Sequence, residues 1–511
     1  MPIVLEHNEG KVTKVFGLQA DQSAYLGRPV LSVLLALAKE FPESILGWVR
    51  QEYSTIFQID HLAKLLRHPR ELISYAPDGL QYLGPEIAYI EDSPFVCVDG
   101  SVRYPTWQTS SAAGAMHASL LSTAAALAEG AKEFDYFLNS FAKLGQAEGV
   151  LCYSEPRLLH GLSEGLGSSK NQASTATLFK FVKQHYKGRW TLLLFLNLWV
   201  YEKRIALLPL FKSLFYQAKQ GKHLHLPATG LEKITYGGSV DVLIPTIGRA
   251  KYLKDVLLDL AQQDLLPARV LIMEQTPKPG MPSELDFLER EWPFEIVHQV
   301  LHPPGACRSR NAGLDQIRSE WVFLADDDIR LPKDFLSKAV SFVRTWQIQA
   351  ATFSCLQEGE AEVQQQVIQW TTFASGCSLV ESAALRNIRF DPALEFGYGE
   401  DKDYGMQLRK QGTDVLYNPH IRVLHLKAPV GGFRYKVEKP WEQVPIVPKP
   451  SPTVLHYKLK HSSPRQLKGY KMTLFIKYYK DQDIRNPFRY YKRFKQQWRS
   501  SVAWAEKLKS N

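Results

Sequence analysis

The sequence predicts an α/β fold with a mostly parallel sheet over residues 236–427. A truncated sheet of the same kind is predicted over residues 1–235, and a basic helical extension over residues 428–511. Three observations predict this organisation. Strand and helix patterns alternate after Gly237 and Gly238, segments of the first half recur in the second, and basic residues concentrate at the carboxyl end.

The composition indicates a globular protein. Of the 511 residues, 45% are hydrophobic and 22% charged, which is too apolar for a disordered chain. The net charge is +10, but residues 456–511 hold 15 Lys and Arg against three Asp and Glu, so the remainder is close to neutral at −2. Basicity therefore belongs to the tail and not to the body of the protein.

Cysteine usage and the apolar runs predict the compartment. Five cysteines without C-x-x-C pairing indicate reduced thiols, and the first residues lack the layout of a signal peptide. The nearest candidate for a membrane span, Thr191–Tyr201, is shorter than the roughly 20 residues that a spanning helix needs and predicts a buried or interfacial helix. We therefore expect a cytoplasmic protein, and the basic tail adds the expectation that it lies peripherally at the inner face of the membrane.

The residues after Gly238 alternate between strand and helix patterns. SVDVLIPT and RVLIMEQ are apolar runs typical of buried strands, and AKYLKDVLLDLAQQD between them has helical spacing. RSRNAGLDQIRSE predicts another helix and WVFLADDD a third strand, after which Pro332 suits the first turn of a further helix. This order predicts βαβ units with parallel strands.

Segments of the first half resemble segments of the second. Trp107–Met116 resembles Trp370–Leu379, and Phe134–His160 resembles Lys402–His425, with offsets of 263 to 268 residues. The first copy has Ile45–Glu52 (ILGWVRQE) where the second has three aspartates, and it lacks the later Gly-Glu-Asp sequence. We expect a degenerate, non-catalytic first domain that serves as a scaffold or in acceptor binding. The alternative is that generic strand and helix patterns recur by chance.

Three aspartates follow the third predicted strand of the second half. In extended backbone, Asp326 and Asp328 project to the same side and Asp327 to the other. Such a carboxylate pair at the carboxyl end of a strand can bind Mn²⁺ or Mg²⁺ together with the phosphates of a nucleotide. The alternative is a solvated acidic loop, which like-charge repulsion disfavours in the absence of a cation.

A second acidic group opens a later predicted helix. Glu400 and Asp401 stand in its first turn, where they either complement the helix dipole or take a proton from an attacking hydroxyl. His425 ends the following strand and either completes the metal site or forms an ordinary hydrogen bond. Further residues at loops and strand ends are predicted to contact the phosphates and base of a nucleotide: Pro245, Thr246, Arg249, Glu274, Arg310, Asn311, Asp326 and Asp327.

Together these residues resemble the family 2 glycosyltransferases, inverting enzymes of the GT-A fold. The resemblance runs from about Val240 to Lys427 and follows the order PTIGR, RN-x-G, DDD as the D-x-D motif, GED-x-D, and Y-x-P with His. It implies that Asp326 and Asp328 bind metal and nucleotide sugar, that Asp401 is the general base, and that His425 is a metal ligand. Glu274 departs from the pattern, because many members carry Asp there.

The resemblance implies transfer of a sugar from a nucleotide-diphosphate sugar to a hydroxyl of a glycan or lipid-linked acceptor, in polysaccharide or surface-glycan synthesis. The alternatives are a non-catalytic glycan-binding scaffold protein and a nucleotidyltransferase on a similar sheet. In the tail, residues 456–511, Lys and Arg alternate with aromatic residues, a pattern that favours an anionic membrane surface over nucleic acid. A helix packed on the body remains the third interpretation of that segment.

Overall fold

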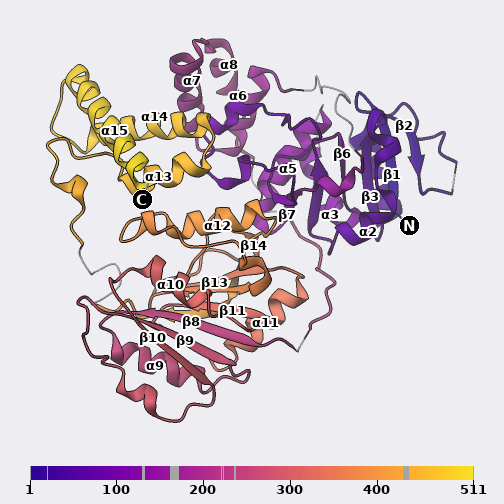
Figure 1. The fold of residues 1–511 in the computed structure, drawn as a ribbon. Coiled ribbons are helices and arrows are strands. Elements are labelled where there is room, and N and C mark those ends of the chain that lie inside the picture. Colours follow the sequence, from indigo (N-terminus) through magenta and orange to yellow (C-terminus); the bar gives the residue numbers. More distant parts are fainter. Residues whose placement is uncertain are drawn as a thin grey trace. The chain divides into compact units, whose positions relative to one another are not determined.

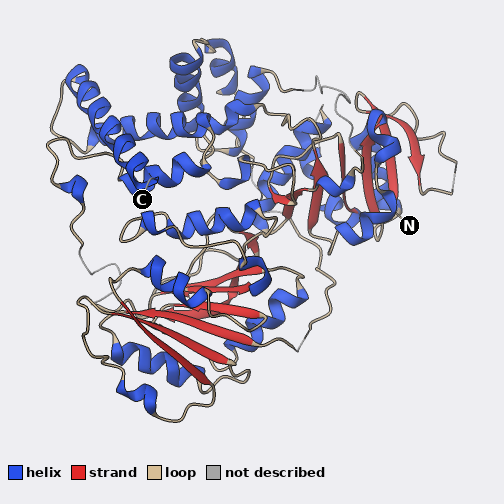
Figure 2. Ribbon diagram, in the orientation of Figure 1, coloured by secondary structure: helices blue, strands red, loops and turns tan. Residues whose placement is uncertain are grey.

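The computed structural model describes residues 2–19, 21–128, 133–161, 172–219, 221, 224–234, 237–429 and 437–509. The chain divides into two compact units, and both have α/β architecture (Figures 1 and 2). The first unit comprises Met1–Leu231 and Ser462–Tyr478, and the second comprises Glu232–His461 and Tyr479–Asn511.

The second unit contains a mixed sheet. Its strands are β8 (Val240–Thr246), β9 (Arg269–Gln275), β10 (Glu295–Leu301), β11 (Trp321–Ala325), β12 (Ile329–Arg330), β13 (Ala350–Leu356), β14 (Ile368–Gln369), β15 (Cys377–Glu381) and β16 (Leu416–His425). Their order is β10-β9-β8-β11-β15-β13-β16-β12, with β14 also paired to β16. The strands β10, β9, β8 and β11 are parallel, as the βαβ pattern predicts, whereas β15 is antiparallel to both of its neighbours.

Helices cover both faces of this sheet. They are α9 (Ala250–Leu260), α10 (Ala306–Leu314), α11 (Phe335–Thr345) and α12 (Glu400–Lys410). On one face, α10 and α12 share an apolar core with Leu243, Val322 and Leu324 of the strands. On the other face, Phe335 of α11 packs against Phe323 and Phe353, and Figure 1 shows α9 on the side away from α10.

The amino-acid pattern explains these elements. Every residue of β8 is buried, as expected for a central strand covered on both faces. In α9 the buried residues recur at helical spacing, Leu253, Val256, Leu257 and Leu260, so that one stripe faces the sheet. The only charged residue of β8, Asp241, is fully buried and accepts hydrogen bonds from Arg269 of β9 and from Ser319 before β11. This pairing satisfies a carboxylate that would otherwise be costly to bury.

The first unit contains a second mixed sheet. Its strands are β1 (Ile3–Asn8), β2 (Lys11–Phe16), β3 (Ile45–Arg50), β4 (Glu71–Tyr75), β5 (Tyr104–Pro105), β6 (Ala113–His117) and β7 (Leu151–Ser154). Its helices are α1 (Val30–Glu40), α2 (Leu62–Leu65), α3 (Ala118–Thr123), α4 (Ala125–Ala128), α5 (Phe134–Glu148), α6 (Thr175–His185), α7 (Arg189–Glu202) and α8 (Leu207–Ser213). One apolar cluster joins α1, α3, α5, α6 and α7 to this sheet.

The two sheets share a strand order. The first reads β1-β3-β6-β4-β7-β5 beyond its edge strand β2, and the second contains the series β8-β11-β15-β13-β16 with β14 next to β16. Each pair in the first series has the same direction as its counterpart: parallel, antiparallel, antiparallel, parallel and antiparallel. Where the second sheet continues into β9 and β10, the first has only the hairpin strand β2. This match is what a duplicated fold would produce, and duplication itself stays a prediction.

The carboxyl-terminal residues form three helices. These are α13 (Pro452–His461), α14 (Pro464–Lys480) and α15 (Pro487–Lys509). Most of α14 belongs to the first unit, whereas α13 and α15 belong to the second. In the part of the chain that the structure describes, none of the helices combines the length and the apolar character needed to cross a bilayer.

Candidate active site at the carboxyl edge of the second sheet

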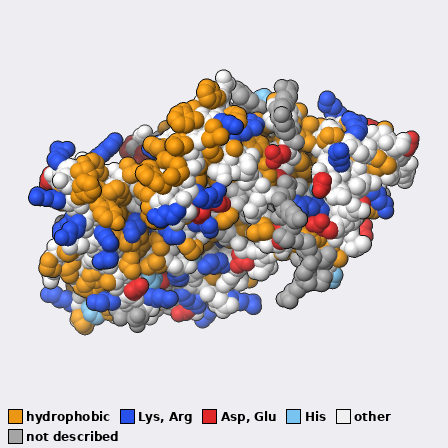
Figure 3. Space-filling model, turned by 90° about the horizontal axis from the view of Figure 1, so that it is seen from above, with side chains coloured by type: hydrophobic (Ala, Val, Ile, Leu, Met, Phe, Trp, Pro, Cys, Tyr) orange, Lys and Arg blue, Asp and Glu red, His pale blue; other side chains and the backbone are white. Residues whose placement is uncertain are grey.

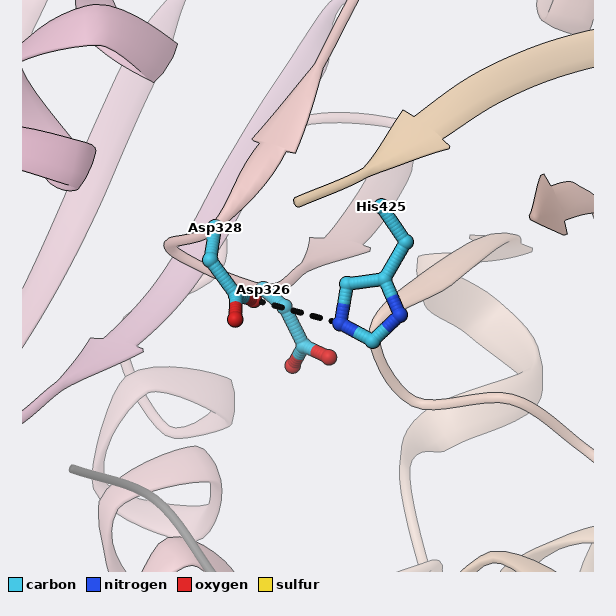
Figure 4. A group of neighbouring side chains, drawn as sticks. All are labelled: Asp326, Asp328 and His425. Atoms are coloured by element: carbon cyan, nitrogen blue, oxygen red, sulfur yellow. Dashed lines mark ion pairs between the residues drawn. The ribbon is translucent and has the colours of Figure 1, made fainter. Parts of the chain in front are cut away.

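Two carboxylates and one imidazole converge at the carboxyl end of β11. Asp326 and Asp328 follow β11 directly, and His425 is the last residue of β16 (Figure 4). One ligand atom from each of these three side chains lies within 4.8 Å of the others. Asp326 and Asp328 thus lie close together as predicted, but a turn at Asp327–Asp328 and not the predicted extended backbone places them there, and the fold brings His425 to them from a distant segment.

The contacts of Asp328 fix its position. One of its carboxylate oxygens lies 3.5 Å from His425 Nε2, and the other accepts a hydrogen bond from the Ala428 amide at 2.9 Å. Burial opposes ionisation of Asp328, but the hydrogen bond from His425 and the charge of Arg249 outweigh it and hold its pKa below the ordinary value. The same hydrogen bond to Asp328 raises the pKa of His425.

The donor set suits a hard divalent cation. Carboxylate oxygens are preferred by Mg²⁺ and Mn²⁺, and imidazole is accepted by Mn²⁺. Asp326 remains 38% exposed, so that a cation can approach it from the cavity. The residues present therefore fit the predicted Mn²⁺ or Mg²⁺, with Asp326, Asp328 and His425 as its ligands.

Asp327 has a different environment from its two neighbours. It is almost completely buried and accepts hydrogen bonds from Thr246 Oγ1 at 2.7 Å and from Arg249 Nη1 at 2.6 Å. Burial raises its pKa to about 6, although Arg249 and Thr246 act in the opposite direction. Asp327 thus ties the loop after β8 to the end of β11, and the carboxylate, the hydroxyl and the guanidinium satisfy one another.

The second acidic group lies at the start of α12. Asp401 Oδ1 accepts a hydrogen bond from the Ser375 amide at 3.1 Å, and burial raises its pKa, an effect that Arg310 partly offsets. Burial and the neighbouring Asp401 raise the pKa of Glu400 to about 7. Glu400 Oε2 is buried and has no hydrogen-bond partner among the residues that the structure describes. Two carboxyl groups with raised pKa values at one cavity are suited to proton transfer.

Arg310 connects the two acidic groups. Its guanidinium donates to Asp326 Oδ1 at 3.0 Å and also carries the positive charge that acts on Asp401 and Glu400. Its Nε is buried, with no hydrogen-bond partner in the described part of the chain. A buried guanidinium with an unused donor is well placed to bind an anionic ligand in a bidentate manner.

These residues line one cavity of about 490 Å³. Of the predicted site residues, the cavity brings together Pro245, Arg249, Arg310, Asp326, Asp327, Asp328, Glu400, Asp401 and His425. The remaining wall residues, which the sequence analysis missed, are Ile247, Gln275, Ala306, Cys355, Ala374, Ser375, Gly376, Cys377, Glu395, Phe396 and Lys427. The size of the cavity is typical of a small-molecule site.

Three predicted residues do not line this cavity. Thr246 donates to Asp327, and Asn311 bonds the backbone of Phe390 through both of its amide atoms at 2.8 Å. The carboxylate of Glu274 accepts from Ser283 at 2.6 Å and contacts His298 at 2.8 Å. Each of these polar side chains thus has partners within the protein, and its direct contact with a nucleotide stays a prediction.

Gly376 and Glu395 could have been recognised only from the structure. A Cβ at Gly376 would lie 2.1 Å from Asp326 Oδ2, so glycine is required for the aspartate to occupy its place. Glu395 accepts the amides of Cys307 and Arg308 at the start of α10 and therefore occupies the positive end of that helix. Neither residue was named as a site residue from the sequence, because each acts through a long-range contact.

Equivalent positions in the first unit are occupied differently. The Arg50 amide donates a hydrogen bond to Ala112 O, and the Asp326 amide donates the corresponding bond to Gly376 O. Arg50 therefore occupies the position in the first sheet that Asp326 occupies in the second. The Ser111 amide donates to Asp135 Oδ1 at 2.7 Å, as that of Ser375 donates to Asp401. Asp135 therefore corresponds to Asp401 and not to Asp403, with which the sequence comparison aligned it. Phe134, which precedes Asp135, packs its ring edge-on against Trp48 and His7.

The fold and the site define a class of protein. The carboxyl edge of an open α/β sheet carries a candidate cation site, a buried guanidinium and two carboxyl groups with raised pKa values, and this edge is where sheets of this type bind ligands. Residues 241–379 match the model of glycosyl transferase family 2. The predicted resemblance is confirmed over this segment.

Comparison with other known proteins gives two results. No curated protein matches the chain. Among solved structures, it is similar to S. aureus TarS 1–349 in complex with UDP, with 20% identity, 35% of this chain and 60% of that chain covered, and a TM-score of 0.30. It is also similar to the mannosyltransferase PcManGT from Pyrobaculum calidifontis in complex with GDP-Man and Mn²⁺, with 15% identity, 55% and 76% coverage, and a TM-score of 0.33. The match thus spans less than two thirds of that TarS chain.

Proposed function

We propose that the protein transfers a sugar from a nucleotide-diphosphate sugar to a hydroxyl of a glycan or lipid-linked acceptor, with inversion at the anomeric carbon. The observation that carries this proposal is the single cavity that joins the site of Asp326, Asp328 and His425 to Asp401 and Glu400. The proposed context is polysaccharide or surface-glycan synthesis.

The proposed reaction is a direct displacement. The acceptor oxygen forms a bond to the anomeric carbon while the bond from that carbon to the diphosphate oxygen breaks, and Asp401 takes the proton of the acceptor hydroxyl. Arg310 and Arg249 supply positive charge on the side of the departing diphosphate. A Mn²⁺ or Mg²⁺ ion bound by Asp326, Asp328 and His425 would neutralise charge on that leaving group.

A larger cleft supports the position of the acceptor. It measures about 1170 Å³ and shares Glu395 and Phe396 with the cavity described above. Its walls carry Trp441 and Trp504, whose rings lie edge to face, and the ammonium of Lys439 lies over the Phe396 ring. Aromatic walls with a few polar groups are typical of ligand sites, and this cleft is the proposed entry of the acceptor.

A panel of nucleotide sugars tests the proposed function. We expect one donor to raise the melting temperature of the full chain in the presence of Mn²⁺ and to be hydrolysed slowly without acceptor, and we expect EDTA to abolish both effects. Turnover of nucleoside triphosphates with no response to any nucleotide sugar would instead identify a nucleotidyltransferase. Binding of glycans without any nucleotide response would identify the scaffold alternative.

The pH dependence of transfer should reflect the two carboxyl groups. A carboxyl group accepts a proton only when ionised, so we expect kcat/KM to fall as the pH is lowered through about 7, where Glu400 titrates. Of the two carboxyl groups at the start of α12, only Asp401 remains in the Glu400→Gln variant, and the acid limb should move to lower pH. The measurement is a pH–rate profile of both proteins, and an unchanged acid limb in the variant would contradict the assignment.

A further inference from the structure

Helices α7 and α8 of the first unit carry a cluster of exposed apolar side chains. Phe215 is 87% exposed, and Leu208, Ile205 and Phe211 each exceed 60%. Within 25 residues of sequence, the exposed large apolar side chains are Leu192, Trp199, Val200, Ile205, Leu207, Leu208, Phe211, Leu214, Phe215 and Tyr216. We call this set the α7–α8 surface. A soluble monomer rarely exposes apolar side chains in such a group unless they have a binding role.

Burial of these residues in the core does not explain their apolar character. The opposite face of α7 is already packed, with Leu193, Leu194 and Leu198 buried in the core of the first unit. At the ends of α8, Ala206 and Ser213 are buried, which leaves Phe211 and Leu208 directed outwards. Thus α7 is apolar on both faces, and only one of these faces is used in folding.

Basic residues accompany the α7–α8 surface. Residues 187–219 contain six Lys and Arg and one acidic residue, Glu202. Glu202 is already bonded to Tyr89 and Arg465, both in the first unit. Figure 3, which views the molecule from the side where α7 and α8 stand in Figure 1, shows hydrophobic side chains gathered with Lys and Arg among them. The partner of this surface must therefore be apolar and anionic at once.

We propose that the α7–α8 surface docks on an anionic lipid bilayer. Its aromatic residues, Trp199, Phe211, Phe215 and Tyr216, are of the kinds that insert at the boundary between head groups and acyl chains, and Lys203 and Lys212 suit the negative surface. A second copy of the chain fits less well, because a symmetric contact would bring the Lys and Arg side chains of the two copies together, and these like charges repel.

The geometry favours docking in the plane of the interface. With 14 residues, α7 is about 21 Å long at 1.5 Å per residue, shorter than the roughly 30 Å hydrocarbon core of a bilayer. The exposed apolar side chains continue beyond α7 into α8 and the segment after it, so the apolar surface is larger than α7 although no single helix is longer. The proposed docking does not depend on the sugar-transfer activity, since it rests on the first unit alone.

Co-sedimentation of the full chain with vesicles tests the proposal. We expect the protein to pellet with phosphatidylglycerol–phosphatidylcholine vesicles, to bind pure phosphatidylcholine more weakly, and to lose binding as salt is added. The variant F211S/L214S/F215S should bind at least tenfold more weakly, and K203E/K212E should lose the preference for the anionic lipid. Because all five side chains are exposed, the melting temperatures should match that of the native protein.

Phe488→Ser is the matched control. Phe488 lies in α15 and is 85% exposed, close to the exposure of Phe215, and it belongs to the tail for which the sequence predicted membrane contact. We expect this variant to bind like the native protein. Normal binding by F211S/L214S/F215S, or loss of binding by Phe488→Ser alone, would overturn the proposal. So would a native dimer in size-exclusion chromatography that the triple variant dissociates, since a second copy would then be the occupant.

Discussion

Replacement of Asp401 by Asn is expected to lower kcat for sugar transfer by about 10²–10⁴-fold, the usual contribution of a positioned general base. The Asn side chain keeps an oxygen that can accept the Ser375 amide, so the start of α12 should retain its structure. Binding of the donor should change little, because the base acts on the acceptor. Initial rates with saturating donor, together with calorimetric titration of the donor, measure the two quantities separately.

Asp315→Asn is the control for this experiment. Asp315 is an exposed aspartate of the same unit that pairs with Arg389, and it lies outside the cavity. We expect turnover at the native level in this variant. Turnover near the native level in Asp401→Asn would remove Asp401 from the role of base, and Glu400→Gln would then be the next variant to assay.

Loss of the carboxylate at Asp326 should abolish the effect of the cation on nucleotide binding. We expect Asp326→Asn to reduce Mn²⁺-dependent affinity for the nucleoside diphosphate at least about 100-fold, because even partners of metal ligands typically contribute 10–100-fold. Asp326 is a better target than Asp328, since it is partly exposed and its replacement removes only the pairing with Arg310. Asp328 is buried and also bonds the Ala428 amide, so its replacement should reduce stability as well.

Calorimetric titration with Mn²⁺ and with EDTA measures this effect. Asp334→Asn serves as the control, because Asp334 is exposed and pairs only with Lys338 on α11. The control should bind the nucleotide as the native protein does. A Mn²⁺-dependent affinity in Asp326→Asn equal to that of the native protein would exclude Asp326 as a ligand.

Local pattern predicted the first part of the second sheet well. RVLIMEQ corresponds to the whole of β9, and the helical spacing after Arg249 corresponds to α9. The sequence could not predict that β15 lies between β11 and β13, because its pairing with β11 joins segments more than 50 residues apart and no local pattern specifies it. The helix expected from Pro332 begins at Phe335 instead.

The candidate site was predictable where chemistry concentrates in short motifs. Asp326, Asp328 and Asp401 could be named because acidic residues next to buried strands or at helix starts require a stabilising cation, partner or helix dipole. The function of Asp327 could not, since its burial and its bonds to Thr246 and Arg249 follow from the packing of two loops. For Thr191–Tyr201, most of α7, the sequence left a buried and an interfacial helix as alternatives, because an apolar helix does not reveal from its sequence which of its faces is covered; the exposed residues of α8 were not predicted.

The two sheets share a strand order, so a comparison of their residues distinguishes those that the fold requires from those that a reaction requires. Asp135 accepts a hydrogen bond from the Ser111 amide in a sheet where Arg50 occupies the position of Asp326. A carboxylate at this helix start therefore has a structural function that does not require an acidic cluster beside it. The same strand order thus places an acidic helix start next to a candidate cation site in one sheet and next to a guanidinium in the other.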